Sequence, residues 1–160
     1  MFKKLAIGTL AAAATTALAL SMSGAALADS PHYDDYSSGW GPLYSKNYQA
    51  KAQGTISVNW DGDGESNEVQ VYGRLWDRDN RSYDEGGKCA YIRFQAEDFD
   101  HDWSPVYSKK YCGYPGYKKF FYQDNDVYSV RAQVCQIGLY SKYPTKCGYW
   151  QDIYSVDGDE

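Results

Sequence analysis

Beyond its first 28 residues the chain has no long apolar run, and nothing there approaches the roughly 18 to 20 apolar residues of a membrane-spanning helix. It has only two histidines, and none of its four cysteines form a C-x-x-C pair, so a zinc site would be poorly supplied with ligands. No later segment repeats apolar residues with a helical period, and no G-x-S-x-G nucleophile motif occurs. These absences argue against a membrane protein, a zinc protein, a helical domain and a triad hydrolase, and we expect no cofactor.

The chain is also short of basic residues. Lys and Arg number 16 against 21 Asp and Glu, which gives a formal net charge of −5 at pH 7. A nucleic-acid partner is not expected, because neutralising phosphates requires a basic face. The acids gather in polar segments at 61–65, 77–85 and 97–102 and in the C-terminal tail, where their plain role is solubility.

Residues 1–28 have the composition of an export signal. Two lysines precede an uncharged stretch rich in Leu and Ala, and Ala26-Leu27-Ala28 has the small-x-small pattern that signal peptidase cleaves. A short membrane anchor is the alternative, but polar residues follow at once. We therefore predict a signal peptide at 1–28 and a secreted, extracellular product with no membrane partner. Removing it would leave 132 of the 160 residues, which suits one domain.

All four cysteines lie beyond this signal, so two disulfides are expected in an oxidising compartment. Three connectivities are open. We favour Cys89 with Cys112 and Cys135 with Cys147, because each pair flanks a chain reversal and would join neighbouring antiparallel strands.

From about residue 51 the chain alternates apolar and polar residues in short runs, separated by Gly, Asp and Asn. This pattern predicts half-buried strands, and seven of them indicate two antiparallel sheets packed face to face. We predict an all-β, disulfide-clipped, immunoglobulin-like antiparallel β-sandwich of about seven strands over 51–160, with a small barrel as the alternative. The residues expected to face the core are Ile56, Val58, Trp60, Val69, Val71, Leu75, Ala90, Ile92, Phe94, Ala96, Tyr128, Val130, Ala132 and Val134.

The segment 36–47, YSSGWGPLYSKN, fits neither a strand nor a helix pattern, and its glycines and proline break regular structure. Aromatic side chains in such a segment suit insertion into a partner's groove or addition to a sheet edge. We predict an extended, flexible N-terminal arm at 29–50 that docks another protein. The alternative is that it folds back over its own domain. The predicted partner-binding residues are Tyr36, Trp40, Pro42, Leu43 and Tyr44.

Tyrosine is abundant, at 17 residues, and suits both protein interfaces and sugar stacking. Ordinary strand propensity accounts for part of this content. The tyrosines at turns and strand ends are Tyr107, Tyr111, Tyr114, Tyr117, Tyr140, Tyr143 and Tyr149.

Two acidic motifs carry weaker signals. DGDGE at 61–65 resembles part of a calcium loop, but it is too short for one, and a hairpin turn is the preferred interpretation. EDFDHDW at 97–103 places Asp98, Asp100 and Asp102 at alternate positions beside His101, which is a conceivable acid–base pair but also an ordinary acidic turn. The second histidine, His32, falls in the predicted arm.

Several segments together resemble small secreted β-sandwich proteins of filamentous actinobacteria, in particular the adaptor subunit of umbrella toxin particles. These segments are WGPLYSKNYQAKAQGTISV, GKCAYIRF followed by YCG, and VRAQVCQI followed by TKCGYW. The resemblance implies a non-enzymatic adaptor that joins a lectin-bearing, trypsin-like subunit to a large repeat-containing toxin protein in interbacterial competition. It places the leader around Trp40 to Tyr44 in the partner.

We therefore expect a secreted adaptor or binding protein and not an enzyme. A carbohydrate-binding or hydrolase-inhibiting module that uses exposed Trp and Tyr is the first rival. An enzyme built on Asp98, Asp100 and His101 is the second.

Overall fold

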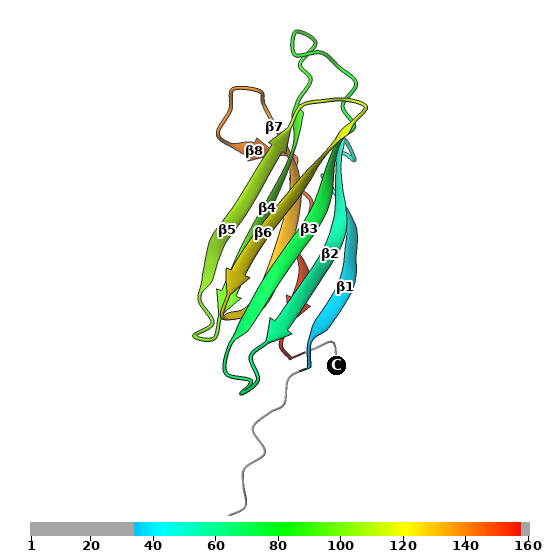
Figure 1. Ribbon diagram of the computed structural model, residues 1–160. Coiled ribbons are helices and arrows are strands. Elements are labelled where there is room, and N and C mark those ends of the chain that lie inside the picture. Colours follow the sequence, from blue (N-terminus) through cyan, green and yellow to red (C-terminus); the bar gives the residue numbers. More distant parts are fainter. Residues whose placement is uncertain (1–33, 158–160) are drawn as a thin grey trace, which may run out of the picture.

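The computed structural model describes residues 34–157. The predicted signal peptide, the first residues of the predicted arm and His32 lie outside this range. The described chain forms strands joined by turns and loops, as Figure 1 shows. The strands are β1 (Tyr36–Tyr44), β2 (Ala50–Trp60), β3 (Asn67–Asp77), β4 (Cys89–Asp98), β5 (Trp103–Tyr111), β6 (Tyr117–Asn125), β7 (Val127–Ile137), β8 (Pro144–Thr145) and β9 (Gln151–Ser155).

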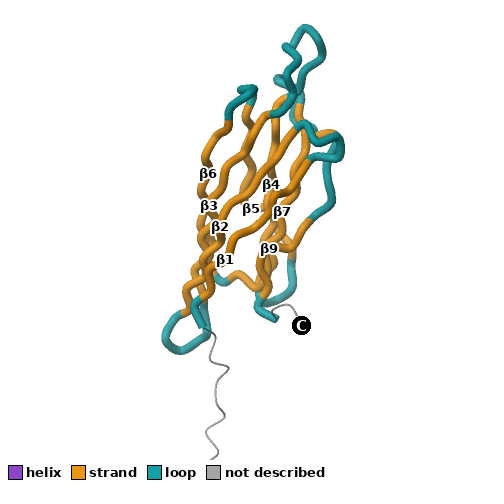
Figure 2. The backbone as a smooth tube through the Cα atoms, turned by 90° about the vertical axis from the view of Figure 1, so that its right-hand side faces the viewer, coloured by secondary structure: helices purple, strands orange, loops and turns teal. Residues whose placement is uncertain are grey.

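Two antiparallel sheets form a sandwich, as the alternating pattern predicts. The four-stranded sheet has the order β1-β2-β3-β6, and the five-stranded sheet has the order β5-β4-β7-β8 with β9 also paired to β7. Figure 2 shows the two layers from the side. The immunoglobulin constant domain pairs its strands in a different order, so the likeness to it stops at the architecture.

The core lies between the sheets. It consists mainly of the alternate strand residues that the sequence pattern predicts to face inward. Every predicted core position of β2, β3 and β4 is buried except Trp60, which is half-buried. Tyr128 is also half-buried, because the pairing of β7 with β4 shifts here: Glu97 pairs with Ser129 but Asp98 with Val127, and Val127 takes the buried position. At the centre an aromatic cluster surrounds Phe94, with Phe120 and Tyr122 at 5.6 and 5.1 Å between ring centroids.

The expectation of a free arm at 29–50 is wrong for Tyr36–Tyr44. These residues form β1, which pairs with β2 from Tyr36 opposite Val58 to Tyr44 opposite Lys51. The register shifts between Trp40 and Leu43, where Gly41 has a φ of 82°. This bulge hides the strand from a period-2 reading, because residues before and after it lie out of phase. The sandwich therefore begins before residue 51, and β1 and β8 raise the strand number above seven.

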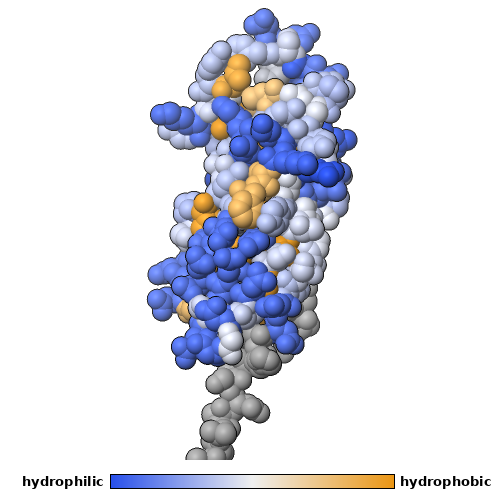
Figure 3. Space-filling view, in the orientation of Figure 1, coloured by the Kyte–Doolittle hydropathy of each residue, from blue (hydrophilic) through white to orange (hydrophobic). Residues whose placement is uncertain are grey.

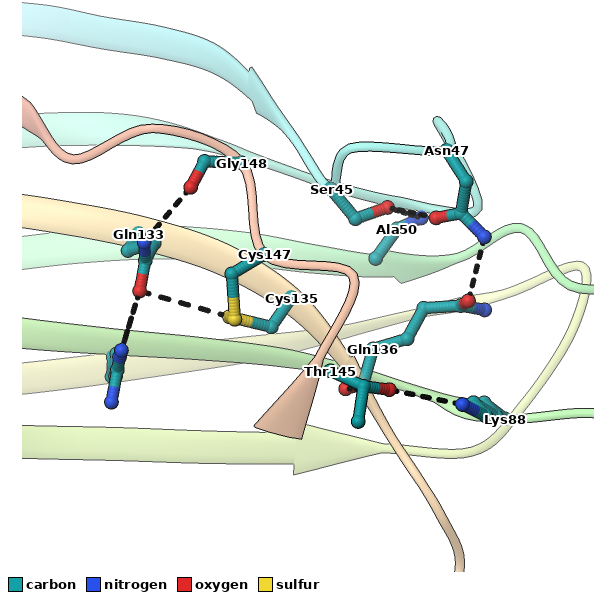
Figure 4. Close-up of a disulfide and its surroundings, with 11 residues drawn as sticks. Ser45, Asn47, Ala50, Lys88, Gln133, Cys135, Gln136, Thr145, Cys147 and Gly148 are labelled. Atoms are coloured by element: carbon teal, nitrogen blue, oxygen red, sulfur yellow. Dashed lines mark hydrogen bonds between the residues drawn. A yellow bond between two sulfur atoms is a disulfide. The ribbon is translucent and has the colours of Figure 1, made fainter. Parts of the chain in front are cut away.

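Both predicted disulfides are confirmed. Cys89–Cys112 joins the start of β4 to the residue after β5 and closes that hairpin. Cys135–Cys147 ties the buried outer side of β7 to the segment between β8 and β9. In Figure 4 this segment passes over β7, and the carbonyl oxygen of its Gly148 accepts a hydrogen bond of 2.8 Å from Gln133 Nε2.

Candidate functional site

The predicted docking residues separate into buried and accessible ones. Trp40 is only 6% exposed, and its ring packs against Phe94 and Phe120 at centroid distances of 5.8 and 6.1 Å. Leu43 is half-buried against the core. Trp40 is therefore an internal anchor that fixes β1 to its own domain, and it is not available to a partner.

The accessible members point in different directions. Tyr36 is exposed at the start of β1, with its ring 5.8 Å from that of Tyr154. Pro42 is exposed at the bulge. Tyr44 is half-buried on the outer face, with its ring 5.4 Å from Tyr48. The structure thus keeps Pro42 and Tyr44 together beside the outer face of the four-stranded sheet.

A row of residues across the four-stranded sheet explains how β1 is seated. Trp40 pairs with Gly54, Gly54 with Gly73, and Gly73 with Phe120. The two central glycines have no side chains, so the rings of Trp40 and Phe120 close over them from either side on the inner face. Large residues flanking small ones fill the core at this level without strain.

On the other side of the same row lies a groove of about 940 Å³. Its lining includes Pro42 on β1, Tyr72 and Arg74 on β3, and Lys119 and Phe121 on β6. The glycines remove side chains from its middle, and the bulge at Gly41 bounds it at the β1 edge. The groove is open and shallow, so it suits a segment laid across the strands more than an enclosed small molecule.

We call the surface around this groove the aromatic–basic face. It comprises Tyr44, Lys51, Tyr72, Arg74, Trp76, Tyr117, Lys119 and Phe121. One register row crosses all four strands, Tyr44 to Lys51 to Trp76 to Tyr117. Within it, Lys51 Nζ lies 4.8 Å from the Trp76 ring centroid, and the Trp76 and Tyr117 rings are 5.5 Å apart.

A second pair of rings stands two outward rows away on the same face, beyond the row of Arg74 and Lys119. Tyr72 and Phe121 are 46% and 45% exposed, with centroids 4.6 Å apart. The Arg74 guanidinium lies 5.2 Å from the Tyr117 ring centroid, which links the two levels. Figure 3 shows this side of the molecule as mostly hydrophilic, with small separate hydrophobic areas.

The charge on this face contrasts with that of the chain. Lys51, Arg74 and Lys119 all project from it, and the only acid at an outward strand position of the four-stranded sheet is Glu68, at the far end. Glu68 is engaged by Gln123 Nε2 at 2.8 Å. Although the chain has a net negative charge, the outer face of its four-stranded sheet is basic and aromatic.

The end of β3 and the β3–β4 loop hold Asp77, Asp79, Asp84 and Glu85 at one end of the sandwich, and three further acidic turns lie at the other end. The turns 61–66, 98–102 and 124–126 lie side by side there, because β2, β4 and β6 all run toward that end (Figure 1). None of these turns contains Lys or Arg. The opposite end carries the most exposed tyrosines, with Tyr140, Tyr143 and Tyr149 at 81%, 80% and 90% exposure.

The other tyrosines named in the sequence analysis fall into a half-buried group and an exposed group. Tyr107 and Tyr111 are half-buried and pack against the core, whereas Tyr114 and Tyr117 are exposed. Sequence alone missed Lys51, Lys119 and Phe121 as surface-site residues. The sequence pattern did indicate that Tyr72, Arg74 and Trp76 share one outward face of their strand, and this was the feature that could have pointed to the surface.

The carboxylates of the 97–103 motif serve a turn. Asp98 Oδ1 accepts hydrogen bonds from the backbone N–H groups of Asp100 and Asp102, both at 3.0 Å. His101 has a φ of 66°, and its Nδ1 lies 3.3 Å from Glu97 Oε1. Asp98 is thus occupied in shaping the β4–β5 hairpin.

The DGDGE motif is a hairpin turn between β2 and β3, as preferred from sequence. Asp61 N–H donates to the Ser66 carbonyl at 3.0 Å, and Gly64 N–H donates to the Asp61 carbonyl at 2.8 Å. In the described range no group of three or more His, Cys, Asp or Glu side chains is placed to hold a metal ion.

Two buried carboxylates organise the loop between β3 and β4. Asp79 accepts hydrogen bonds from Arg81 Nε and Nη2 at 2.9 and 2.8 Å, and from Gln136 Nε2 at 3.0 Å. The Arg81 hydrogen bonds hold the pKa of Asp79 well below its usual range. Asp77 accepts hydrogen bonds from the backbone N–H groups of Asp79 and Gly113, yet burial raises the pKa of its carboxyl. Both carboxyls therefore have structural partners.

No protein-family model matches the chain, and no curated protein matches it. No described segment forms a helix long and apolar enough to cross a membrane. The functional argument therefore depends on the surfaces above.

Proposed function

We propose that this protein is a secreted, non-enzymatic adaptor that binds another secreted protein on its aromatic–basic face. The observation that carries the proposal is the row from Tyr44 to Tyr117, in which aromatic and cationic residues from all four strands of one sheet are register partners, with Lys51, Trp76 and Tyr117 in contact. Stiff aromatic side chains and arginine are the residues that most often dominate binding energy at protein interfaces.

The two disulfides support secretion, because they persist in oxidising compartments. The lack of acids around the groove supports a partner with acidic side chains, since complementary potentials speed encounter and fix orientation.

The resemblance to umbrella toxin adaptors supplies a finer proposal for the partners. In this scheme the chain bridges a lectin-bearing, trypsin-like subunit and a large repeat-containing toxin protein. Pro42 and Tyr44, at the β1 edge of the groove, are the members of the predicted docking set that would touch a partner here.

The test is purification of the tagged, secreted protein from culture supernatant, followed by native mass spectrometry. The wild type should carry large secreted partners in defined stoichiometry. Arg74→Glu and Tyr117→Ala should each reduce recovery at least about tenfold if they remove interface anchors. Tyr143→Ala is the matched control, because it removes an exposed ring outside the face.

Full recovery with both face variants would overturn the proposed surface. A wild-type protein that is always monomeric in its own secretome would overturn the adaptor function. Retention by insoluble neutral polysaccharide without any protein partner would favour the carbohydrate-binding alternative.

A further inference from the structure

The outer face of the five-stranded sheet carries a second set of stacked groups, far from the aromatic–basic face. Arg131 lies over Trp103 with its guanidinium carbon 3.9 Å from the ring centroid. The Trp150 ring is shared by two guanidinium groups, those of Arg131 at 5.1 Å and Arg93 at 5.0 Å. We call these four residues the Trp–Arg stack.

Neighbouring amides hold both arginines in place. Arg93 donates from Nε and Nη2 to Gln133 Oε1 at 2.9 and 2.7 Å, and Gln133 is its register partner on β7. Arg131 donates from Nε to Gln95 Oε1 at 2.9 Å, and Gln95 is its register partner on β4. The guanidinium orientation is therefore fixed, while most of the N–H donors are not used within the described chain.

Among residues 34–157, no carboxylate forms an ion pair with either arginine. In the described range, no Asp or Glu oxygen lies within 4.0 Å of either guanidinium. Asp152 is opposite Arg131 in the β7–β9 pairing but forms no ion pair with it. Glu97 has its Oε1 beside His101 instead. Elsewhere the same chain does pair an arginine, since Arg81 reaches Asp79 at 2.8 Å.

Two like charges on one ring repel each other unless an anion lies between them or nearby. Stacking leaves the edges of the guanidinium planes, where the N–H groups lie, able to form two parallel hydrogen bonds to an oxyanion. We infer that the Trp–Arg stack is a binding site for an acidic glycan, through its uronate carboxylates or its sugar phosphates.

A glycan fits this surface better than a peptide does. Gln95 and Gln133 stand beside the arginines, and the next row toward the end of β7 holds Tyr91 and the disulfide-bonded Cys135. The indole rings of Trp103 and Trp150, both half-buried, are the apolar elements of the stack. A protein interface needs an apolar centre, whereas a sugar presents hydroxyls, one C–H face and its acid groups.

The experiment titrates the intact disulfide-bonded protein with oligogalacturonate and with a phosphomannan oligosaccharide, followed by tryptophan fluorescence and calorimetry. Neutral xylo-oligosaccharide and poly-glutamate are the comparison probes. Binding of one or both acidic glycans, weakened by added salt and absent with the neutral probe, is the expected result. The two acidic probes distinguish carboxylate from phosphate as the recognised group.

Arg93→Gln and Arg131→Gln should each weaken glycan binding at least about tenfold, because each removes a charge-assisted pair of hydrogen bonds. Arg131→Lys retains the charge but loses the planar fork, so an intermediate loss is expected and gives a second variant should the glutamine forms fail to fold. Arg74→Gln is the matched control on the opposite sheet. It should leave glycan binding unchanged and so separates this site from the proposed protein-binding face.

Three results would overturn the inference: no binding of either acidic glycan at millimolar concentration, equal binding by wild type and folded Arg131→Gln, or tighter binding of poly-glutamate than of both glycans. In the first two cases the stack is a structural brace of the sheet.

Discussion

The ring of Phe120 on β6 occupies the space that a side chain on Gly73 of β3 would need. The two residues are direct register partners at the centre of the four-stranded sheet. At Gly54, the register partner of Trp40, a side chain would meet the Tyr72 carbonyl oxygen first and then the Trp40 ring at 2.9 Å. This arrangement places β1 in the fold and leaves the groove on the outer face.

Gly73→Ala should destabilise the domain by about 1–3 kcal/mol, because the new methyl group must displace the Phe120 ring in a close-packed core. Urea unfolding followed by fluorescence measures the change. Gly62→Ala is the control, since a Cβ at Gly62 meets nothing within 4 Å, and it should change stability by less than about 0.5 kcal/mol. Equal stability of the two variants would contradict the packing described.

Trp40→Ala should cost about 3–5 kcal/mol of stability, as expected for a large aromatic residue removed from a core. Trp40→Phe should cost less, because it keeps a ring and removes an indole N–H that is buried without a hydrogen-bond partner. Thermal unfolding of both variants makes the comparison. If Trp40→Ala unfolds like the wild type, the residue is not an internal anchor.

Replacing Cys89 and Cys112 by alanine should lower the free energy of unfolding by about 2–5 kcal/mol, since the bond closes a loop of 23 residues. The Cys135 and Cys147 pair, separated by 12 residues, should give a loss of similar size. Denaturant unfolding of each double variant, with the other bond intact, provides the measurement. Reduction of the wild type should then destabilise it more than either double variant.

The stability of the β3–β4 loop should depend on pH in a direction set by Asp79. Its pKa is lowered in the folded protein by the Arg81 hydrogen bonds, so its contribution is present above the unfolded value of 3.8 and is lost as pH falls below that value. Asp79→Asn should therefore cost about 1–3 kcal/mol at pH 7. The difference in free energy of unfolding between wild type and Asp79→Asn should become smaller as pH falls from about 5 to about 2.

The pKa of Asp77 shifts in the opposite direction to that of Asp79, so Asp77→Asn is an informative comparison. Burial raises its folded pKa, so ionisation of this carboxyl opposes folding as pH rises through that pKa. The variant should consequently lose less stability at pH 7 than Asp79→Asn does. Urea midpoints across the pH range test both carboxyls, and a gap for Asp79→Asn that stays constant with pH would refute its assigned role.

Much of the architecture follows from local patterns. Ile92 and Phe94 alternate with polar neighbours along β4, and Val71 and Leu75 do so along β3, so their inward parity could be predicted before any pairing was known. The cysteines flank chain reversals, which made the observed disulfides the favoured ones. The bulge at Gly41 interrupted the same pattern in β1, and the strand was missed.

The candidate surfaces were less accessible to sequence reasoning. Tyr44, Lys51, Trp76 and Tyr117 come from four strands, and only their register places them in one row. The Trp–Arg stack likewise joins residues from β4, β5 and β7 and the segment before β9. Outward parity marks such residues as accessible, but it does not say which of them become neighbours.

By itself, the sequence determined the strand character of the chain, the inward face of its central strands and a pattern that suits two sheets, because side-chain alternation is a property of each strand alone. Only the tertiary structure decided that Trp40 belongs to the core, that cations gather on the outer faces and that three acidic turns meet at one end. Those outcomes depend on long-range register, which is set by how the rings of Trp40 and Phe120 fill the space over Gly54 and Gly73.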